Sequence, residues 1–340
     1  MSIDLQKRLE VRLNELQYGN GEQYLVFQPV PCGLGGQIHG RVLTLALALA
    51  LGRKGVFLTE DDPPYCQTLE IMHTKVELDV RLDEKPLVDI SKAQPDQIVR
   101  HDPMHLRTEE PHFYETLLAR ISREINSEVP SWRIIEGILF NWMKPLPDLE
   151  LYCNSERLRL GVDEGTLGVH FRRGDKAVES AFVPAILINN EIARIHHVWP
   201  FSKLFLASDS PNAADEIICP PGVQLIFDVS EPRHNNANHK MLLNAPELVK
   251  QETRVAFKNI KLLASCGGIV GQDNAHFATL AASSILSRTG RVEGIKLLNG
   301  RIAERNSQLV FVYYAVKRRL RAVARRIFPQ FSIQARMARK

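Results

Sequence analysis

In the second half of the chain, short apolar segments alternate with longer segments of helical periodicity. The apolar segments TLGVHFRR (166–173), KLFLASDS (203–210), VQLIFDV (223–229) and GGIVG (267–271) predict four strands. Between and after them, the spacing of apolar residues predicts helices over about 181–195, 212–217, 246–266 and 275–287. Strands that alternate with helices imply a parallel sheet covered on both faces, so this half is predicted to be a doubly wound α/β domain.

The first half opens with a similar but shorter pattern. Residues 24–31 predict a strand, and residues 37–51 predict a helix that is apolar nearly all round and therefore buried. Residues 56–61 predict the next strand, which completes a βαβ unit. Residues 62–150 are less regular, with a predicted helix over 112–127 and a connector over 140–152.

At 340 residues the chain is long for one layered domain. We therefore predict two Rossmann-like domains, over residues 1–160 and 161–305, followed by a basic C-terminal segment over 306–340. A cleft between two such domains is a common place for a ligand.

Composition narrows the class of protein. The chain is 44% hydrophobic and 24% charged, which is typical of a soluble globular protein. The N-terminal stretch is charged and unlike a signal peptide, and the longest apolar run, over 42–51, is too short to span a bilayer. The five cysteines are scattered and form no CxxC pair, which favours a cytoplasmic protein without a zinc or disulfide framework.

The formal net charge of +4 is unevenly distributed. Residues 317–340 hold nine Lys or Arg and no acid; removing nine from 43 leaves 34 basic residues against 39 acids. A body near −5 disfavours general nucleic-acid binding. In the tail, Val316, Leu320, Val323 and Ile327 share one helical face, a pattern that favours peripheral binding of Lys317–Lys340 to an anionic membrane surface. A packed helix followed by a disordered tail is the alternative.

A dense charge cluster follows the first strand of the second half, in the segment GVHFRRGDKAVES (168–180). Alternation along the strand places His170 and Arg172 on one side and Arg173 on the other. Arg172 is then suited to face a pyrophosphate, because its planar fork makes two parallel hydrogen bonds. Arg173 is expected to brace the loop, paired with Asp175. An internal ion-pair cluster or an RGD adhesion signal would be the alternatives.

Two further strand ends carry polar residues. Asp209 follows one strand, and Gln272, Asp273 and Asn274 follow the last one. Each set alone is explained by capping of the next helix. Because the carboxyl ends of parallel strands meet at one edge, three polar ends together favour a ligand site.

The glycine-rich segment Gly33-Leu-Gly-Gly36 precedes the helix of the first half. Backbone N–H groups of Gly35 and Gly36 there favour an anion or a sugar hydroxyl, and a tight turn that needs positive φ is the alternative. The spacing fits neither a GxGxxG fingerprint nor a P-loop. The histidines form no metal-binding motif, and there is no GxSxG nucleophile elbow, so we expect neither a metal nor serine-hydrolase chemistry.

Together these motifs resemble the superfamily of α-1,2-, α-1,6- and nodulation fucosyltransferases. VHFRRGDK is similar to its HxRRxD motif, LASDSP to its second motif with Ser210 in place of an acid, and Leu263–Leu280 to its third. The segment Gly33–Gln37 is similar to the GLGNQ turn of the α-1,2 branch. The resemblance covers motifs spread over roughly residues 30–285.

The resemblance implies a GT-B-like fold, a GDP-fucose donor without any further cofactor, and inversion at the anomeric carbon without a metal. It implies Arg172 on the β-phosphate, Glu179 as the base for the acceptor hydroxyl, and donor contacts from His170, Lys176 and Asp209. Asn259 stands where the family has a guanine-reading aspartate.

The sequence therefore predicts a cytoplasmic fucosyltransferase acting on a glycan or a lipid-linked oligosaccharide. A glycosyltransferase for another nucleotide sugar, and a non-catalytic glycan-binding homologue, are the two alternatives. The acceptor, the linkage and the oligomeric state are not specified by these motifs.

Overall fold

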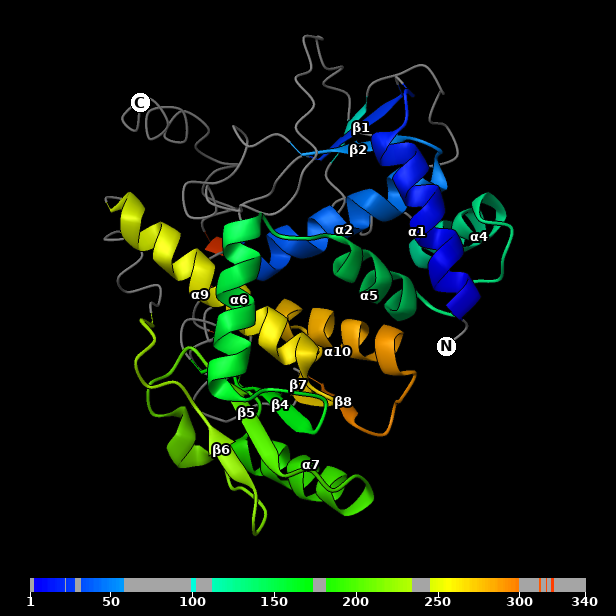
Figure 1. The fold of residues 1–340 in the computed structure, drawn as a ribbon. Helices are drawn as coiled ribbons and strands as arrows, with labels where there is room; N and C mark the ends of the chain where they lie inside the picture. Colours follow the sequence, from blue (N-terminus) through cyan, green and yellow to red (C-terminus); the bar gives the residue numbers. More distant parts are fainter. Residues whose placement is uncertain are drawn as a thin grey trace.

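The computed structural model describes residues 3–21, 23–27, 32–57, 99–101, 112–173, 182–233 and 245–299, together with the single positions 312, 316, 319 and 320. Two parallel sheets organise these residues, one in each half of the chain. Figure 1 shows the smaller sheet with α1, α2, α4 and α5 at one end of the molecule and the larger sheet at the other.

The first sheet has β1 (Tyr24–Phe27) at its centre, paired in parallel with β2 (Lys54–Val56) and β3 (Val99–His101). The helices around it are α1 (Ile3–Tyr18), α2 (Leu34–Ala50), α4 (Phe113–Glu124) and α5 (Trp132–Trp142). α2 is buried all round from Gly35 onward, as its continuous apolar sequence predicts.

The second sheet follows α6 (Pro147–Leu160). It contains β4 (Thr166–His170), β5 (Lys203–Ala207), β6 (Gln224–Ile226), β7 (Gly268–Gln272) and β8 (Ile295–Leu298). All its neighbours are parallel, in the order β6-β5-β4-β7-β8. By position in the chain this order is 3-2-1-4-5, the order of a Rossmann domain, and it reverses between β4 and β7.

Helices cover both faces of the second sheet (Figure 1). α9 (Pro246–Ser265) and α10 (His276–Thr289) pack on one face, and α7 (Ala185–Val198) packs on the other; η4 (Ala213–Glu216) is a short 3₁₀ helix after β5. The second sheet is buried on both faces, which explains why β4 and β7 are buried at every position. The predicted α/β class with parallel sheets is confirmed.

The two halves share one hydrophobic core, because α5 of the first half packs along α10 of the second. Gly137 allows this close approach: a Cβ there would lie 2.5 Å from the carbonyl carbon of Ser283 and 2.6 Å from Ser287 Oγ. The predicted boundaries at 160 and 305 fall outside both sheets, but the core runs across the first of them.

Several elements differ from the sequence prediction. α2 begins at Leu34, so Gly35 and Gly36 lie in its first turn; neither these nor Gly33, whose φ is −65°, needs a positive φ. The turn explanation of these glycines is therefore wrong. α5 and β8 were not predicted, and α6 begins inside the predicted connector because Pro147 serves as a helix start rather than a break.

The strands of the second half are also shorter than their apolar segments. β4 ends at His170 and β5 at Ala207, so the arginines and Asp209 stand beyond the last ladder residues. The direction of these side chains therefore depends on contacts made after the strands end, and not only on the alternation of side chains along the strands.

Candidate functional site

The carboxyl edge of the second sheet brings together the charged and polar strand ends. β4 and β7 are neighbours in this sheet, and the chain order reverses between them. In open α/β sheets such a switch point forms a crevice where ligands bind. His170 ends β4 and Gln272 ends β7, so both flank this point.

Arg172 is held at the edge by Asp209. Its Nε lies 3.1 Å from Asp209 Oδ2, and its side chain keeps 30% of its surface exposed. Asp209 Oδ1 accepts a hydrogen bond of 2.7 Å from the backbone N–H of Arg173. Asp209 therefore ties the end of β5 to the end of β4 and does not cap η4, whose N-cap is Asn212. The helix-cap interpretation of Asp209 is wrong.

Arg173 lies on the opposite side and is fixed from three directions. Its Nε and one terminal nitrogen donate to the carboxylate of Glu216 at 3.2 and 2.8 Å, and its other terminal nitrogen donates to the carbonyl of Val183 at 3.1 Å. Its guanidinium stacks on Phe171 and Phe182 at 4.0 and 5.4 Å from the ring centres. In the described structure Glu216 and Val183 hold the Arg173 side chain, while its predicted partner Asp175 lies outside the described residues.

His170 packs against Phe277, which in turn lies against Gly35 of the first half. The two rings stack with centres 5.4 Å apart, and Phe277 belongs to the first turn of α10. A Cβ at Gly35 would lie 2.8 Å from the Phe277 ring, and a Cβ at Gly36 would lie 2.6 Å from Cys32 Sγ. Gly35 therefore lets the start of α2 approach the start of α10 and brings the first half against the switch point, whereas Gly36 makes room for the Cys32 side chain just before α2.

The end of β7 leads directly into α10 without a side-chain cap. The N-cap of α10 is Ala275, which makes no side-chain hydrogen bond, while Asp273 and Asn274 are exposed. Capping therefore does not explain these residues. Gln272 is 2% exposed, and its Nε2 has no hydrogen-bond partner among the described residues. A buried N–H donor beside a helix N-terminus is suited to donate a hydrogen bond to an anionic or hydroxyl-bearing ligand.

Asn259 lies in α9 and contacts Glu231, which belongs to the loop after β6. Its Nδ2 donates to Glu231 Oε2 at 2.9 Å, while its Oδ1 lacks a hydrogen-bond partner within the described chain. Lys258 donates to the other oxygen of Glu231. Arg233 donates to the backbone carbonyl of Ser208 at 3.2 Å, which links this loop to the end of β5. Sequence reasoning missed Glu231 and Arg233 because their partners come from a distant helix and strand.

A second buried polar group was also missed. His39 Nδ1 lies 2.8 Å from Glu136 Oε1, and Ser283 donates to Glu136 Oε2. The His39 ring stacks on His276 with centres 4.5 Å apart. Three helices, α2, α5 and α10, thus share one polar cluster beside the first turn of α10. A histidine inside the predicted buried helix of residues 37–51 was the sequence signal for it.

Three of the predicted residues lie outside the described part of the chain, namely Lys176, Glu179 and Asp175. Within the described part, no group of three or more His, Cys, Asp or Glu could hold a metal ion. In the same residues, no helix is long and apolar enough to cross a membrane.

No protein-family profile matches the chain, and no curated protein matches its sequence. Among solved structures, it is similar to NodZ α-1,6-fucosyltransferase soaked with GDP-fucose, with 14% identity, a TM-score of 0.42, and coverage of 78% of this chain and 93% of NodZ. NodZ from Bradyrhizobium also matches in another crystal structure.

It is also similar to a mutant of Arabidopsis thaliana FUT1 in complex with GDP, with 13% identity, a TM-score of 0.47, and coverage of 84% of this chain and 73% of that one. The match to POFUT1 in complex with GDP-fucose has 11% identity and a TM-score of 0.42, and covers 83% of this chain and 99% of POFUT1. With every one of these TM-scores below 0.5, the likenesses establish neither a family nor an activity for this chain.

Proposed function

We propose that the chain is an inverting, metal-independent glycosyltransferase that transfers fucose from GDP-fucose to a glycan or a lipid-linked oligosaccharide. The observation that carries this proposal is the position of Arg172, which is partly exposed at the switch point of a Rossmann sheet and held there by Asp209. His170, the start of α10 and the buried amide of Gln272 stand around the same edge.

In this mechanism the acceptor hydroxyl attacks the anomeric carbon, and the bond to the GDP oxygen breaks on the opposite face. Negative charge then develops on the departing β-phosphate. Arg172 stabilises that charge through its guanidinium fork, with Lys176 and the N-terminal amides of α10 in support. Glu179 takes the proton of the acceptor hydroxyl.

The donor base is proposed to lie beside α9. Asn259 Oδ1 is a buried acceptor without a described partner, suited to an N–H group of guanine. A neutral amide offers one acceptor where a carboxylate offers two, so this position discriminates guanine less strongly. A glycosyltransferase for another nucleotide sugar is the second candidate, and Asn259 is the observation that favours it.

The test is calorimetric titration of GDP-fucose into the full chain in EDTA. We expect binding, with at least a tenfold loss in Arg172→Ala. Arg194→Ala, which removes a half-exposed arginine of α7 that is paired with Glu191, is the matched control and should bind as the parent does. Equal affinity of the Arg172→Ala and parent proteins would refute the proposed donor site, and stronger binding of UDP-sugars would favour the second candidate.

Catalysis needs a separate readout, because a non-catalytic homologue would also bind the donor. Slow hydrolysis of GDP-fucose by the parent protein, lost in Glu179→Gln with donor binding retained, is the expected result. Binding without any hydrolysis or transfer to a panel of glycans would support the non-catalytic alternative.

The membrane proposal rests on a different segment. Val312, Val316 and Leu320 are helical positions four residues apart, and each is more than half exposed. An exposed apolar stripe next to a run of basic residues suits an anionic bilayer. We expect sedimentation with phosphatidylserine vesicles but not with neutral vesicles, and loss of binding when residues 317–340 are removed.

A further inference from the structure

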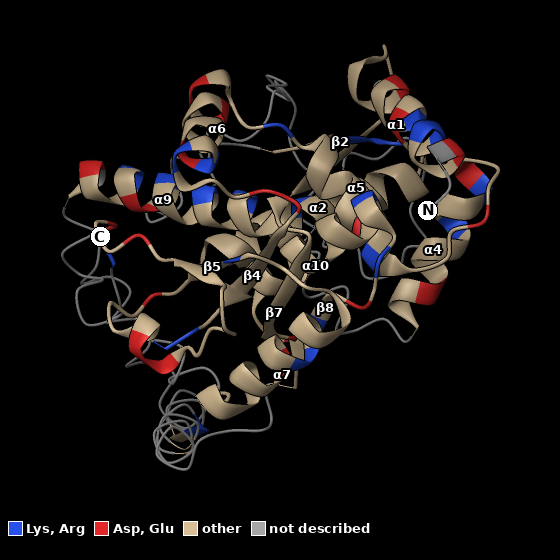
Figure 2. Cartoon of the chain, turned by 60° about the horizontal axis from the view of Figure 1, so that its bottom comes forward, with Lys and Arg blue, Asp and Glu red and all other residues tan. Residues whose placement is uncertain are grey.

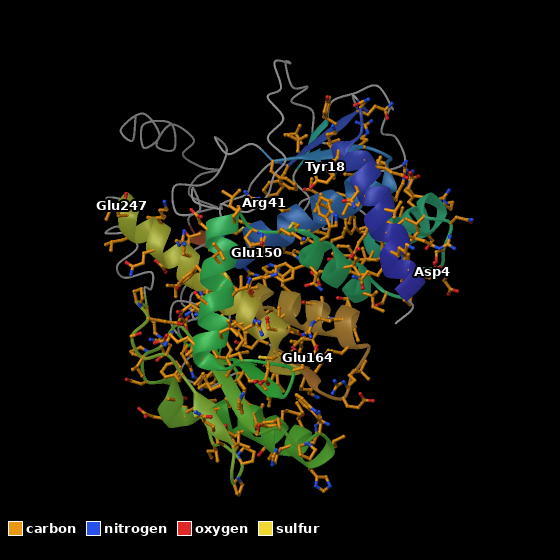
Figure 3. All side chains as sticks on the ribbon, in the orientation of Figure 1. Asp4, Tyr18, Arg41, Glu150, Glu164 and Glu247 are labelled. Atoms are coloured by element: carbon orange, nitrogen blue, oxygen red, sulfur yellow. The ribbon has the colours of Figure 1, made fainter. Side chains whose placement is uncertain are left out.

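A cavity lies away from the carboxyl edge, where the connection from α5 to α6 meets α9. Its volume is about 230 Å³, and its walls come from the end of α5, from α6 and from the last turns of α9. Figure 2 shows basic positions on both α6 and α9, the two helices that flank it, and Glu150, labelled in Figure 3, stands on α6 at its side.

Three basic side chains line this cavity, namely Lys144, Arg157 and Lys261. None of them forms an ion pair or a side-chain hydrogen bond with a described residue, although Glu150 lines the same space. Basic neighbours on the same two helices behave differently: Arg159 pairs with Glu156 and Asp228, and Lys258 pairs with Glu231. These three cations therefore line a space with room for a ligand.

Lys261 is the most deeply set of the three. Its ammonium lies 5.1 Å from the centre of the Phe140 ring, which is 1% exposed. Burial lowers the pKa of Lys261, while the neighbouring Cys153 and Glu150 act in the opposite direction. The Phe140 ring attracts the ammonium, but the three N–H donors of Lys261 have no hydrogen-bond acceptor in the described chain, and a bound anion would supply one.

Charge and size indicate the class of anion. Three cations and one carboxylate leave a formal excess of two positive charges, which matches a dianion. A cavity of about 230 Å³ is smaller than the sites of drug-sized ligands, so the ligand is small. We propose that this cavity is a second anion site that binds a phosphate dianion, as inorganic phosphate or as the phosphate group of a small monoester.

The experiment measures anion binding by calorimetry and by thermal shift, using the full chain with Arg172→Ala so that the carboxyl-edge site contributes as little as possible. Sodium phosphate, glycerol 3-phosphate and sodium acetate are titrated at matched ionic strength. We expect both phosphates to bind and raise Tm and acetate to have no effect. Stronger binding of the monoester would assign the site to an organic phosphate, and equal binding would assign it to the phosphate group alone.

Substitutions in the cavity locate the binding. Lys261→Met, in the same background, is expected to weaken phosphate binding at least tenfold, and Lys261→Arg to retain it, because the arginine keeps the charge. Lys7→Met removes an exposed lysine of α1 and should change nothing. No binding of either phosphate, binding of acetate as strong as that of phosphate, or unchanged affinity in Lys261→Met would each overturn the proposal.

Discussion

Gly137→Ala tests the contact that holds the two halves of the molecule together. The added Cβ would lie 2.5 Å from the carbonyl carbon of Ser283, whereas real Cβ atoms essentially never come closer than 3.0 Å. The obstacle is backbone and cannot rotate away, so α5 and α10 must separate by more than 0.5 Å. A gap of that size removes roughly a quarter of the dispersion energy at each atomic contact between α5 and α10.

The expected net effect is a loss of about 3 kcal/mol in the free energy of unfolding, at the upper end of what overpacking costs. This net loss already includes a gain of about 1 kcal/mol from the higher helix propensity of alanine relative to glycine. Thermal unfolding of the full chain should show a Tm lower by at least about 5 °C. α10 also carries His276 and Phe277, so donor binding should weaken as well.

Gly21→Ala is the matched control, since a Cβ there meets nothing within 4 Å and φ is not positive. Its Tm should stay within about 1 °C of the parent value. If Gly137→Ala were as stable as the parent, or gained the stability that helix propensity alone predicts, the close packing of α5 on α10 would be refuted.

Three other substitutions and conditions test separate parts of the structure. Arg173→Ala removes the paired hydrogen bonds to Glu216 and should lower the unfolding free energy by about 2 kcal/mol in urea denaturation; an unchanged midpoint would contradict its bracing role. Although burial alone would raise the pKa of Asp228, hydrogen bonds from Ser230 and Arg159 lower it to about 2. Because the pKa of Asp228 is lower in the folded state than its ordinary value of 3.8, its carboxylate stabilises the fold at any pH above 3.8. That stabilisation is lost as the pH falls toward 2. The difference in Tm between the parent and Arg159→Ala should therefore shrink over that window, and a constant difference would exclude the linkage. In phosphate-free buffer, Lys261→Met should leave Tm equal or higher, because it replaces a half-buried ammonium that has no acceptor among the described residues with an apolar group; a clear fall in Tm would show that the lysine stabilises the fold.

Much of the second half could be predicted from local pattern. The four predicted strands and their helices are confirmed in position, because buried parallel strands leave continuous apolar segments and helices leave a 3.6-residue period. β8 was missed because only its last residue is buried, so its pattern is weak. α5 was missed because its apolar positions lie beside the prolines of a predicted connector.

Only part of the candidate site could be predicted from local sequence pattern. The position of Arg172 at a strand end follows from the sequence, since a charge cluster after an apolar strand must stand at the edge of the sheet. Its pairing with Asp209 does not follow, because the sequence favours a donor contact or a helix cap for Asp209 and carries no sign of an ion pair between two strand ends. The partners of Arg173 changed for the same reason: Glu216 is distant in sequence but reaches the same side of the sheet.

Local sequence patterns were enough to predict the α/β class, the order of most strands and helices, and which charged residues lie at strand ends. These properties depend on local periodicity and on the position of each residue within its own element. Three features came only from the packing of distant elements: Gly35 and Gly137 allow close helix contacts, His39 meets Glu136 and His276, and three cations that have no ion-pair partner among the described residues line one cavity. Each of these depends on packing between elements far apart in the chain, and no local pattern records which distant surface a side chain will face.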